Sequence, residues 1–157
     1  MEFVIIGKGG SKYAVQDSNN KQVYTVKKKS FGQKFDLLDK SHYNLYSMTQ
    51  VENDKRPAFQ VIHNDAAFMT IECKSLFVDP TLIAITKGLR YEIASKDRKD
   101  FDIILDGKKI GHIAAGTSGT GESRYDFTAD NNSYEDYLLL FAVAIDKAFG
   151  EFNRQAR

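Results

Sequence analysis

Residues 133–152 read S-Y-E-D-Y-L-L-L-F-A-V-A-I-D-K-A-F-G-E-F, and this stretch decides the fold. Residues 137–145 are all apolar or aromatic. At about 100° per residue they cover the whole circumference of a helix, so the helix has no polar face. It is too short to span a bilayer, which takes about 20 apolar residues, and the charged Asp146 and Lys147 follow it. Such a helix has to be enclosed by protein on every side, and we predict a central helix over residues 133–152.

The start of this helix is predicted at Ser133. The serine oxygen can accept a hydrogen bond from a backbone N–H of the first turn, and Asp136, three residues on, favours the positive end of the helix. The pair is a weaker form of the capping box.

The composition indicates one domain, residues 1–157, large enough to bury a core without disulfides. Lys and Arg number 22 against 21 Asp and Glu, so the net charge of +1 attracts neither nucleic acid nor acidic lipid globally. Cys73 is the single cysteine, which excludes an intramolecular disulfide and a cysteine-based zinc cluster. The first residues, M-E-F-V-I-I-G-K, do not resemble a signal peptide. We expect a cytoplasmic protein.

Short extended runs separated by turn residues precede the helix. The turns are marked by Gly9-Gly10, the run of residues 17–20, residues 39–41, residues 63–65, Lys87-Gly88 and Asp106-Gly107. Between them the sequence predicts twelve strands, over residues 2–6, 13–16, 22–28, 34–38, 43–49, 58–62, 68–74, 82–86, 89–94, 101–105, 108–114 and 123–128.

Four of the predicted hairpins, starting at Tyr13, Phe35, Phe59 and Phe101, share one order of residue types: aromatic, polar, aliphatic, turn, then alternating apolar. Either a repeated unit forms a meander that closes on itself, or any hairpins with a two-residue period look alike. Barrels of about eleven strands have room for a helix. We therefore predict a mainly β protein, a closed antiparallel barrel of about twelve strands enclosing the hydrophobic C-terminal helix.

Together with the twelve strands and the helix, two segments carry a resemblance to a known family. They are Y-T-V-K-K-K-S-F-G-Q-K-F-D-L-L-D of residues 24–39 and A-I-D-K-A-F-G-E of residues 144–151. The chain resembles the Tubby C-terminal-like superfamily, most closely its LURP-one-related and phospholipid scramblase-like branch, over nearly its whole length. The resemblance implies a twelve-stranded barrel threaded by its helix, often a membrane-associated or phosphoinositide-binding module. The sequence lacks the proline-rich N-terminal region and the acylated cysteine cluster of scramblases, and it is shorter than animal Tubby proteins.

Several motifs do not support catalysis or metal binding. In G-T-S-G-T-G-E-S from Gly116, Glu122 stands where a phosphate loop needs lysine, so we expect a mobile loop. Residues 126–136 have oxygens for calcium but lack the EF-hand spacing, which leaves calcium a minor alternative. His42, His63 and His112 match no metal spacing, and Cys73 is predicted to point inward as inert packing. The sequence indicates no cofactor and no metal.

The basic run Lys27-Lys28-Lys29, with Lys34 nearby, is the candidate ligand-binding surface. If the strand continues, Lys28 lies on one face and Lys27 and Lys29 on the other. The lysines either serve solubility at a strand end or bind an anionic lipid headgroup. Aromatic residues do not alternate with them as they do in a single-strand nucleic-acid platform.

The sequence thus predicts a non-enzymatic binding module that associates with anionic lipid at a membrane surface, as a peripheral protein, or with a protein partner. The alternative is an enzyme with a site at the barrel mouth acting on an unidentified small molecule. A charged patch without an acid–base cluster favours the first, and a deep polar pocket with perturbed titrating groups favours the second. Nucleic acid is not an expected partner, and the oligomeric state stays open.

Overall fold

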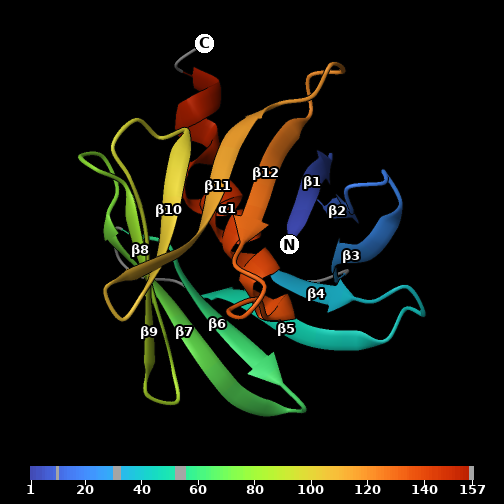
Figure 1. The fold of residues 1–157 in the computed structure, drawn as a ribbon, viewed down its shortest axis with the longest axis horizontal. Coiled ribbons are helices and arrows are strands. Elements are labelled where there is room, and N and C mark those ends of the chain that lie inside the picture. The colour runs from blue at the N-terminus through green and yellow to red at the C-terminus, as the bar shows by residue number, and fades with distance from the viewer. Residues whose placement is uncertain (10, 30–32, 52–55, 156–157) are drawn as a thin grey trace.

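The computed structural model describes residues 1–9, 11–29, 33–51 and 56–155, with side chains up to residue 150 (Figure 1). It contains twelve strands, a short 3₁₀ helix η1 and one α-helix α1. The strands are β1 Glu2–Lys8, β2 Lys12–Gln16, β3 Gln22–Lys28, β4 Lys34–Leu38, β5 Asn44–Val51, β6 Ala58–His63, β7 Ala66–Ser75, β8 Thr81–Thr86, β9 Leu89–Ser95, β10 Asp100–Leu105, β11 Lys108–Thr117 and β12 Ser123–Ala129. The helices are η1 Asp136–Leu138 and α1 Leu139–Gln155.

The strands form a closed antiparallel meander. Each strand pairs with the next one along the chain, and β12 pairs with β1 to close the ring, with Glu2 opposite Thr128 and Ile6 opposite Arg124. The N-terminal ammonium of Met1 strengthens this closure by donating to the carbonyl oxygen of Ala129 at 3.0 Å and to Oδ1 of Asn131 at 2.7 Å. The predicted barrel of twelve strands is confirmed.

The turn residues behave as their chemistry requires. Asn20, Asn64, Asp65, Lys87, Asp106 and the following Gly107 all have positive φ. Among the strand ends, the largest shift is at β11, which continues to Thr117 because Ala115, Gly116 and Thr117 pair with β12. The first residues of the glycine-rich stretch therefore belong to a strand, and the loop begins only at Ser118.

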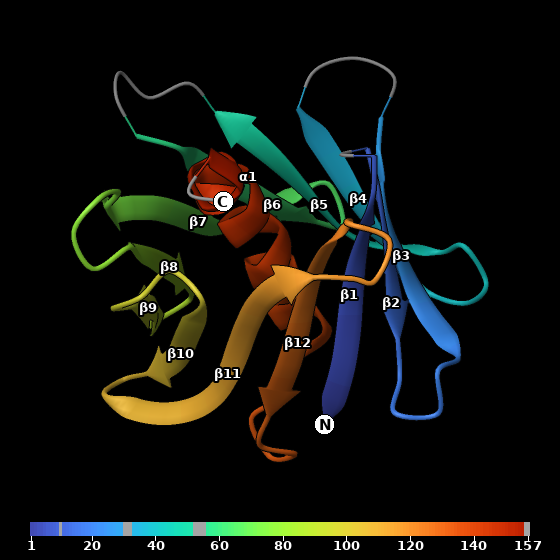
Figure 2. The ribbon, with the colours of Figure 1, turned by 90° about the horizontal axis from the view of Figure 1, so that it is seen from above.

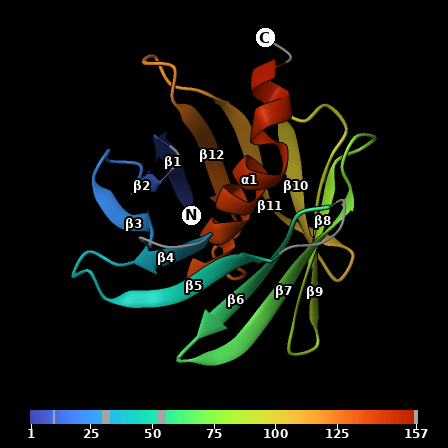
Figure 3. The same ribbon diagram turned by 180° about the vertical axis from the view of Figure 1, so that it is seen from behind.

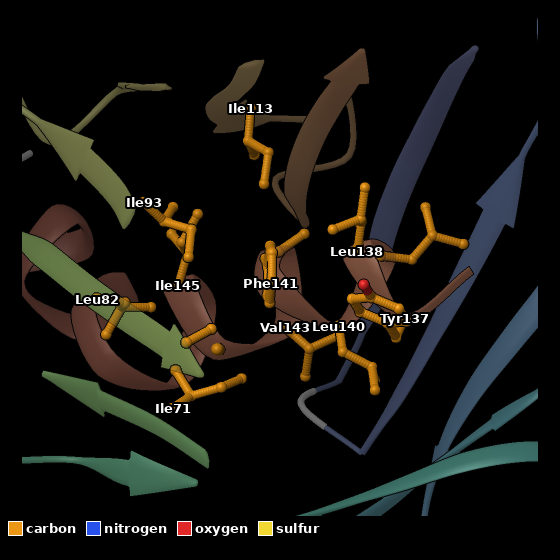
Figure 4. Close-up of a cluster of buried hydrophobic side chains, with 14 of the residues drawn as sticks. Ile71, Leu82, Ile93, Ile113, Tyr137, Leu138, Leu140, Phe141, Val143 and Ile145 are labelled. Atoms are coloured by element: carbon orange, nitrogen blue, oxygen red, sulfur yellow. The ribbon is translucent and has the colours of Figure 1, made fainter. Parts of the chain in front are cut away.

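Helix α1 runs through the interior of the barrel, as Figures 1 and 2 show. Residues 138–145 are fully buried, at 0% exposure. Inward side chains of the strands surround them: Phe141 packs edge-on against Tyr91, with ring centroids 5.4 Å apart, and Figure 4 shows Ile71, Leu82, Ile93 and Ile113 around the same segment. The prediction of a helix wrapped on all sides is confirmed.

The predicted cap on Ser133 is wrong. The chain first makes the single 3₁₀ turn η1, whose N-cap residue is the extended Glu135, and no side chain caps it. The carboxylate of Asp136 instead accepts hydrogen bonds from the hydroxyls of Tyr24 at 2.6 Å and Tyr134 at 3.1 Å. The carboxylate of Asp136, which was predicted to stabilise the start of the helix, instead binds two tyrosine hydroxyls.

None of the helices in the described part of the chain is long and apolar enough to cross a membrane.

Candidate functional site

The meander gives the barrel two ends with different turns. We define the basic end as the described residues of the loops and strand ends at the β1–β2, β3–β4, β5–β6, β7–β8, β9–β10 and β11–β12 connections. The acidic end comprises the other five connections and the segment from Asp130 to Asp136. Figure 3 shows the C-terminus at the top and the β6–β7 and β8–β9 turns at the bottom. Phe149 of α1 stacks on Phe101 at the start of β10, so the helix leaves the barrel at the basic end.

Charge separates between these ends. Among the described residues, cations outnumber acids at the basic end: Lys8, Lys12, Lys27, Lys28, Lys29, Lys34, Arg56, Lys74, Lys96, Arg98, Lys99 and Lys147 stand against Asp36, Asp79, Asp97, Asp100 and Glu122. The described residues of the acidic end include Glu2, Asp17, Asp39, Asp65, Asp106, Asp130, Glu135 and Asp136 against Lys21, Lys40, Lys87, Arg90, Lys108, Lys109 and the N-terminal ammonium of Met1. A chain with a net charge of +1 therefore presents one strongly cationic end, whereas acids and cations nearly balance at the other.

The candidate lysines lie on the basic end. Lys28 pairs with the buried Phe35 and so faces the barrel opening, whereas Lys27 is opposite Asp36 on the outer face. The backbone of Lys29 bonds to that of Lys34 at 2.9 Å, which brings the two ends of the hairpin together. The exposed Lys12, which pairs with Lys27 across β2–β3, joins the same surface, although the sequence analysis did not select it.

One acid lowers the local charge of these lysines. Asp36 is only 7% exposed and lies 3.3 Å from Nζ of Lys29. The hydroxyl of Ser47 donates to its other carboxylate oxygen at 2.6 Å. Lys8, further round the same end, pairs with Glu122 of the glycine-rich loop at 3.5 Å. Both ion pairs leave the lysine about half exposed, with 55% of Lys29 and 48% of Lys8 open to solvent, so they are weak pairs that a stronger anion can replace.

A buried polar cluster lies beneath the basic end. Asp146 of α1 is 7% exposed and accepts hydrogen bonds from the hydroxyls of Tyr13 at 2.5 Å and Tyr125 at 2.6 Å. The next residue, Lys147, places its ammonium 5.0 Å from the ring centre of Phe35. Sequence reasoning missed this carboxylate, since Asp146 was taken only as a charge ending an apolar run. The strand alternation places Tyr13 and Tyr125 on the inner face of the barrel, and a buried tyrosine hydroxyl requires a hydrogen-bond partner. These two tyrosines could therefore have indicated a buried acceptor.

A groove of about 770 Å³ lies on the outer wall near the acidic end. Its lining includes Met1, Glu2, Asp17, Lys109, His112 and Asp130. His112 approaches Asp102 through Nδ1 and Asp100 through Nε2, each at 3.0 Å. Hydrogen bonds from His112 and Lys109 lower the pKa of Asp102. Both ring nitrogens of His112 therefore face carboxylates.

The remaining predicted positions are dispersed. His42 is an exposed turn residue with positive φ, and His63 stacks on Tyr46 with ring centroids 4.6 Å apart. Cys73 points inward at 5% exposure, as predicted, and burial raises the pKa of its thiol. Within the described residues no group of three or more His, Cys, Asp or Glu side chains is arranged to hold a metal ion, the region of residues 126–136 included.

Comparison with known proteins agrees with this architecture. A solved X-ray structure of a protein from Arabidopsis thaliana matches with a TM-score of 0.61 over 92% of this chain and 88% of that chain. The sequence identity is 14%, so this likeness shows the fold alone. A search of curated proteins found no match. A family model described as LURP-one-related matches residues 1–146, from before β1 to the buried Asp146. The chain belongs to the LURP-one-related family.

Proposed function

We propose that the protein is a non-enzymatic binding module that places its basic end against an anionic phospholipid surface. The observation that supports this most directly is the separation of charge between the two ends, which gives a nearly neutral chain one strongly cationic face. Lys27, Lys28, Lys29 and Lys34 are the ligand-binding candidates within that face. A lipid surface presents many phosphates in one plane, and lysines spread over a rim can contact several of them together.

Weak binding is the expected result. A lysine near an anionic bilayer contributes about 1 kcal/mol, so two or three usable lysines give about 2–3 kcal/mol. The contribution falls as salt shortens the screening length to about 8 Å at physiological ionic strength. Cosedimentation with vesicles that contain phosphatidylglycerol should therefore be weak and salt-sensitive, and vesicles of phosphatidylcholine alone should not bind.

The decisive comparison uses two variants with the same change in net charge. Replacing Lys27, Lys28, Lys29 and Lys34 together by Gln should weaken vesicle binding at least about tenfold. The expected loss of about 2–3 kcal/mol exceeds the roughly 1.4 kcal/mol that corresponds to a tenfold change in affinity. Replacing Lys21, Lys40, Lys87 and Lys108 by Gln at the acidic end should leave binding close to wild type. Equal binding by both variants, or no binding by wild type at low salt, would contradict the proposal and favour a protein or small-molecule partner.

The enzyme alternative is not part of this proposal. A catalytic site needs a base within reach of a substrate proton and, for covalent chemistry, an activated nucleophile. Among the described residues the histidine–carboxylate cluster closest to that pattern is His112, which lies on the outer wall rather than at the barrel mouth and is occupied on both nitrogens.

A further inference from the structure

The loop between β7 and β8 bears an apolar tip at the basic end. Phe77 is 63% exposed and Val78 is 77% exposed, the highest value among the exposed large hydrophobic residues in the described part of the chain. Figure 2 shows this loop at the rim of the barrel, on the left of the view. Exposing two adjacent large apolar side chains costs free energy in water, which their burial against another apolar phase would recover.

The tip is held in one shape by hydrogen bonds to its backbone. Nη2 of Arg98, from the β9–β10 loop, donates to the carbonyl oxygens of Leu76 at 3.2 Å and Phe77 at 2.8 Å. The hydroxyl of Ser75 donates to the carbonyl oxygen of Val78, and the hydroxyl of Thr81 donates to the backbone carbonyl oxygen of Asp79 at 2.7 Å. The tip therefore needs little further ordering when it binds, which preserves affinity.

The tip and the neighbouring connections of the basic end carry more cations than acids. Within the described residues, the β5–β6, β7–β8 and β9–β10 connections carry five cations, Arg56, Lys74, Lys96, Arg98 and Lys99, and three acids, Asp79, Asp97 and Asp100. Arg56 is fixed in place by a 2.7 Å hydrogen bond to the carbonyl oxygen of Lys74. Asp97 accepts backbone N–H bonds from Asp100 and Lys99, and these lower its pKa to about 2, so it stays ionised. The net charge of the described residues in this part of the basic end is positive.

We propose that Phe77 and Val78 insert into the boundary between headgroups and acyl chains of an anionic bilayer, while the cations around them remain at the level of the phosphates. The inference rests on the proposed function, in which the basic end faces such a bilayer, and adds a second contact to it. An electrostatic patch alone gives marginal binding, whereas a patch combined with an inserted apolar group gives stable association. The strands β4 to β7 lie between the β3–β4 turn, which bears the lysines, and the β7–β8 loop on the same rim. Contacts at two separate points of the rim also fix the orientation of the barrel.

A bilayer explains the tip better than a protein surface does. Two exposed side chains on a loop with a net positive charge around it do not form the contact area of about 800 Å² per partner that a stable protein interface needs. They match an interface in which a thin apolar layer begins directly below a layer of negative charge.

The absence of tryptophan from the sequence permits a direct test, because one introduced tryptophan reports on its own position. With phosphatidylglycerol-containing vesicles, emission of Val78→Trp should shift to the blue and be quenched by brominated acyl chains. Tyr43→Trp, at a comparably exposed position of 64% on the acidic end, should show neither change. Cosedimentation measured on the same samples separates the two proposals. Vesicle-bound Val78→Trp without quenching overturns the inserted tip and leaves the lysine contact standing, whereas no binding by wild type overturns both.

A second variant tests the energetic role of the tip. Phe77→Ser with Val78→Ser keeps every lysine and should reduce vesicle partitioning about tenfold, from the apolar area no longer buried. Both side chains are exposed, so the melting temperature should stay near that of wild type. Tyr43→Ser is the matched control and should bind normally. Undiminished binding of the double variant would overturn the inference, with a protein partner for the tip as the remaining explanation.

Discussion

The two ends of the barrel each hold a carboxylate bound by two tyrosine hydroxyls, but the surroundings differ. At the basic end Asp146, Tyr13 and Tyr125 are buried, whereas at the acidic end Asp136, Tyr24 and Tyr134 are half-buried. Among the described residues, cations clearly exceed acids around the first cluster and nearly balance them around the second. In an antiparallel meander successive turns alternate between ends, so a charge pattern that alternates from turn to turn becomes a separation along the barrel axis. Total charge alone does not reveal such a surface.

The largest expected effect concerns the helix that joins the ends. Ala142→Arg places an unpaired charge inside the barrel, and we expect no cooperative fold, because burying an unpaired charge costs more than the protein's whole stability. Leu139→Ala should fold with a loss of about 2–5 kcal/mol, from transfer and cavity terms. Circular dichroism during urea unfolding measures both, and a cooperatively unfolding Ala142→Arg protein would contradict the central position of the helix.

A smaller effect distinguishes the two carboxylates. Asp146→Ala leaves two buried hydroxyls without their acceptor and should cost about 2–4 kcal/mol, whereas Asp136→Ala should cost about 1 kcal/mol because water can reach its tyrosines. Urea unfolding at neutral pH gives both values. Combining Tyr13→Phe, Tyr125→Phe and Asp146→Leu should recover most of the loss, since an apolar group then replaces each polar one. Equal costs at the two ends would show that the difference in burial has no energetic consequence.

The smallest effect is a pH dependence at the acidic end. Burial, together with the hydrogen bond to Asp136, raises the pKa of Tyr24 to about 12. The folded state therefore favours the neutral phenol, so its contribution is fully present below about pH 10 and is lost as pH rises toward 12. The free energy of unfolding of wild type should fall more steeply over this range than that of Tyr24→Phe, with the exposed Tyr43→Phe as control. The same slope in all three proteins would contradict the assignment.

The sequence predicted the features that follow from local periodicity. The all-apolar run of residues 137–145, the alternating strands and the positive-φ residues of the turns determined the barrel and its central helix. The position of Asp136 was misjudged because its partner Tyr24 lies more than a hundred residues away in the chain. Local rules for helix caps carry no information about such a contact.

The candidate site was predicted only in part. Lys27, Lys28, Lys29 and Lys34 were found because they are close in sequence, whereas Lys12 joins them only through strand pairing. The exposed tip was missed because the predicted strand ends at residue 74, and Phe77 and Val78, which follow it, belong to no recognisable motif. Whether such residues are buried depends on where β7 ends, and hydrogen bonds from Arg98, a residue of another hairpin, hold the loop that follows it.

The order of elements along the chain has a consequence for how the protein is made. The helix that fills the barrel follows all twelve strands, and the closing pair joins Glu2 to Thr128. During synthesis on a ribosome, the strands therefore emerge before the segment that will cover their apolar faces. Long-range closure of this kind slows folding and leaves apolar surface exposed in the meantime. We expect the nascent chain to acquire its native core only once the helix has emerged from the ribosome, and to depend on chaperones until then.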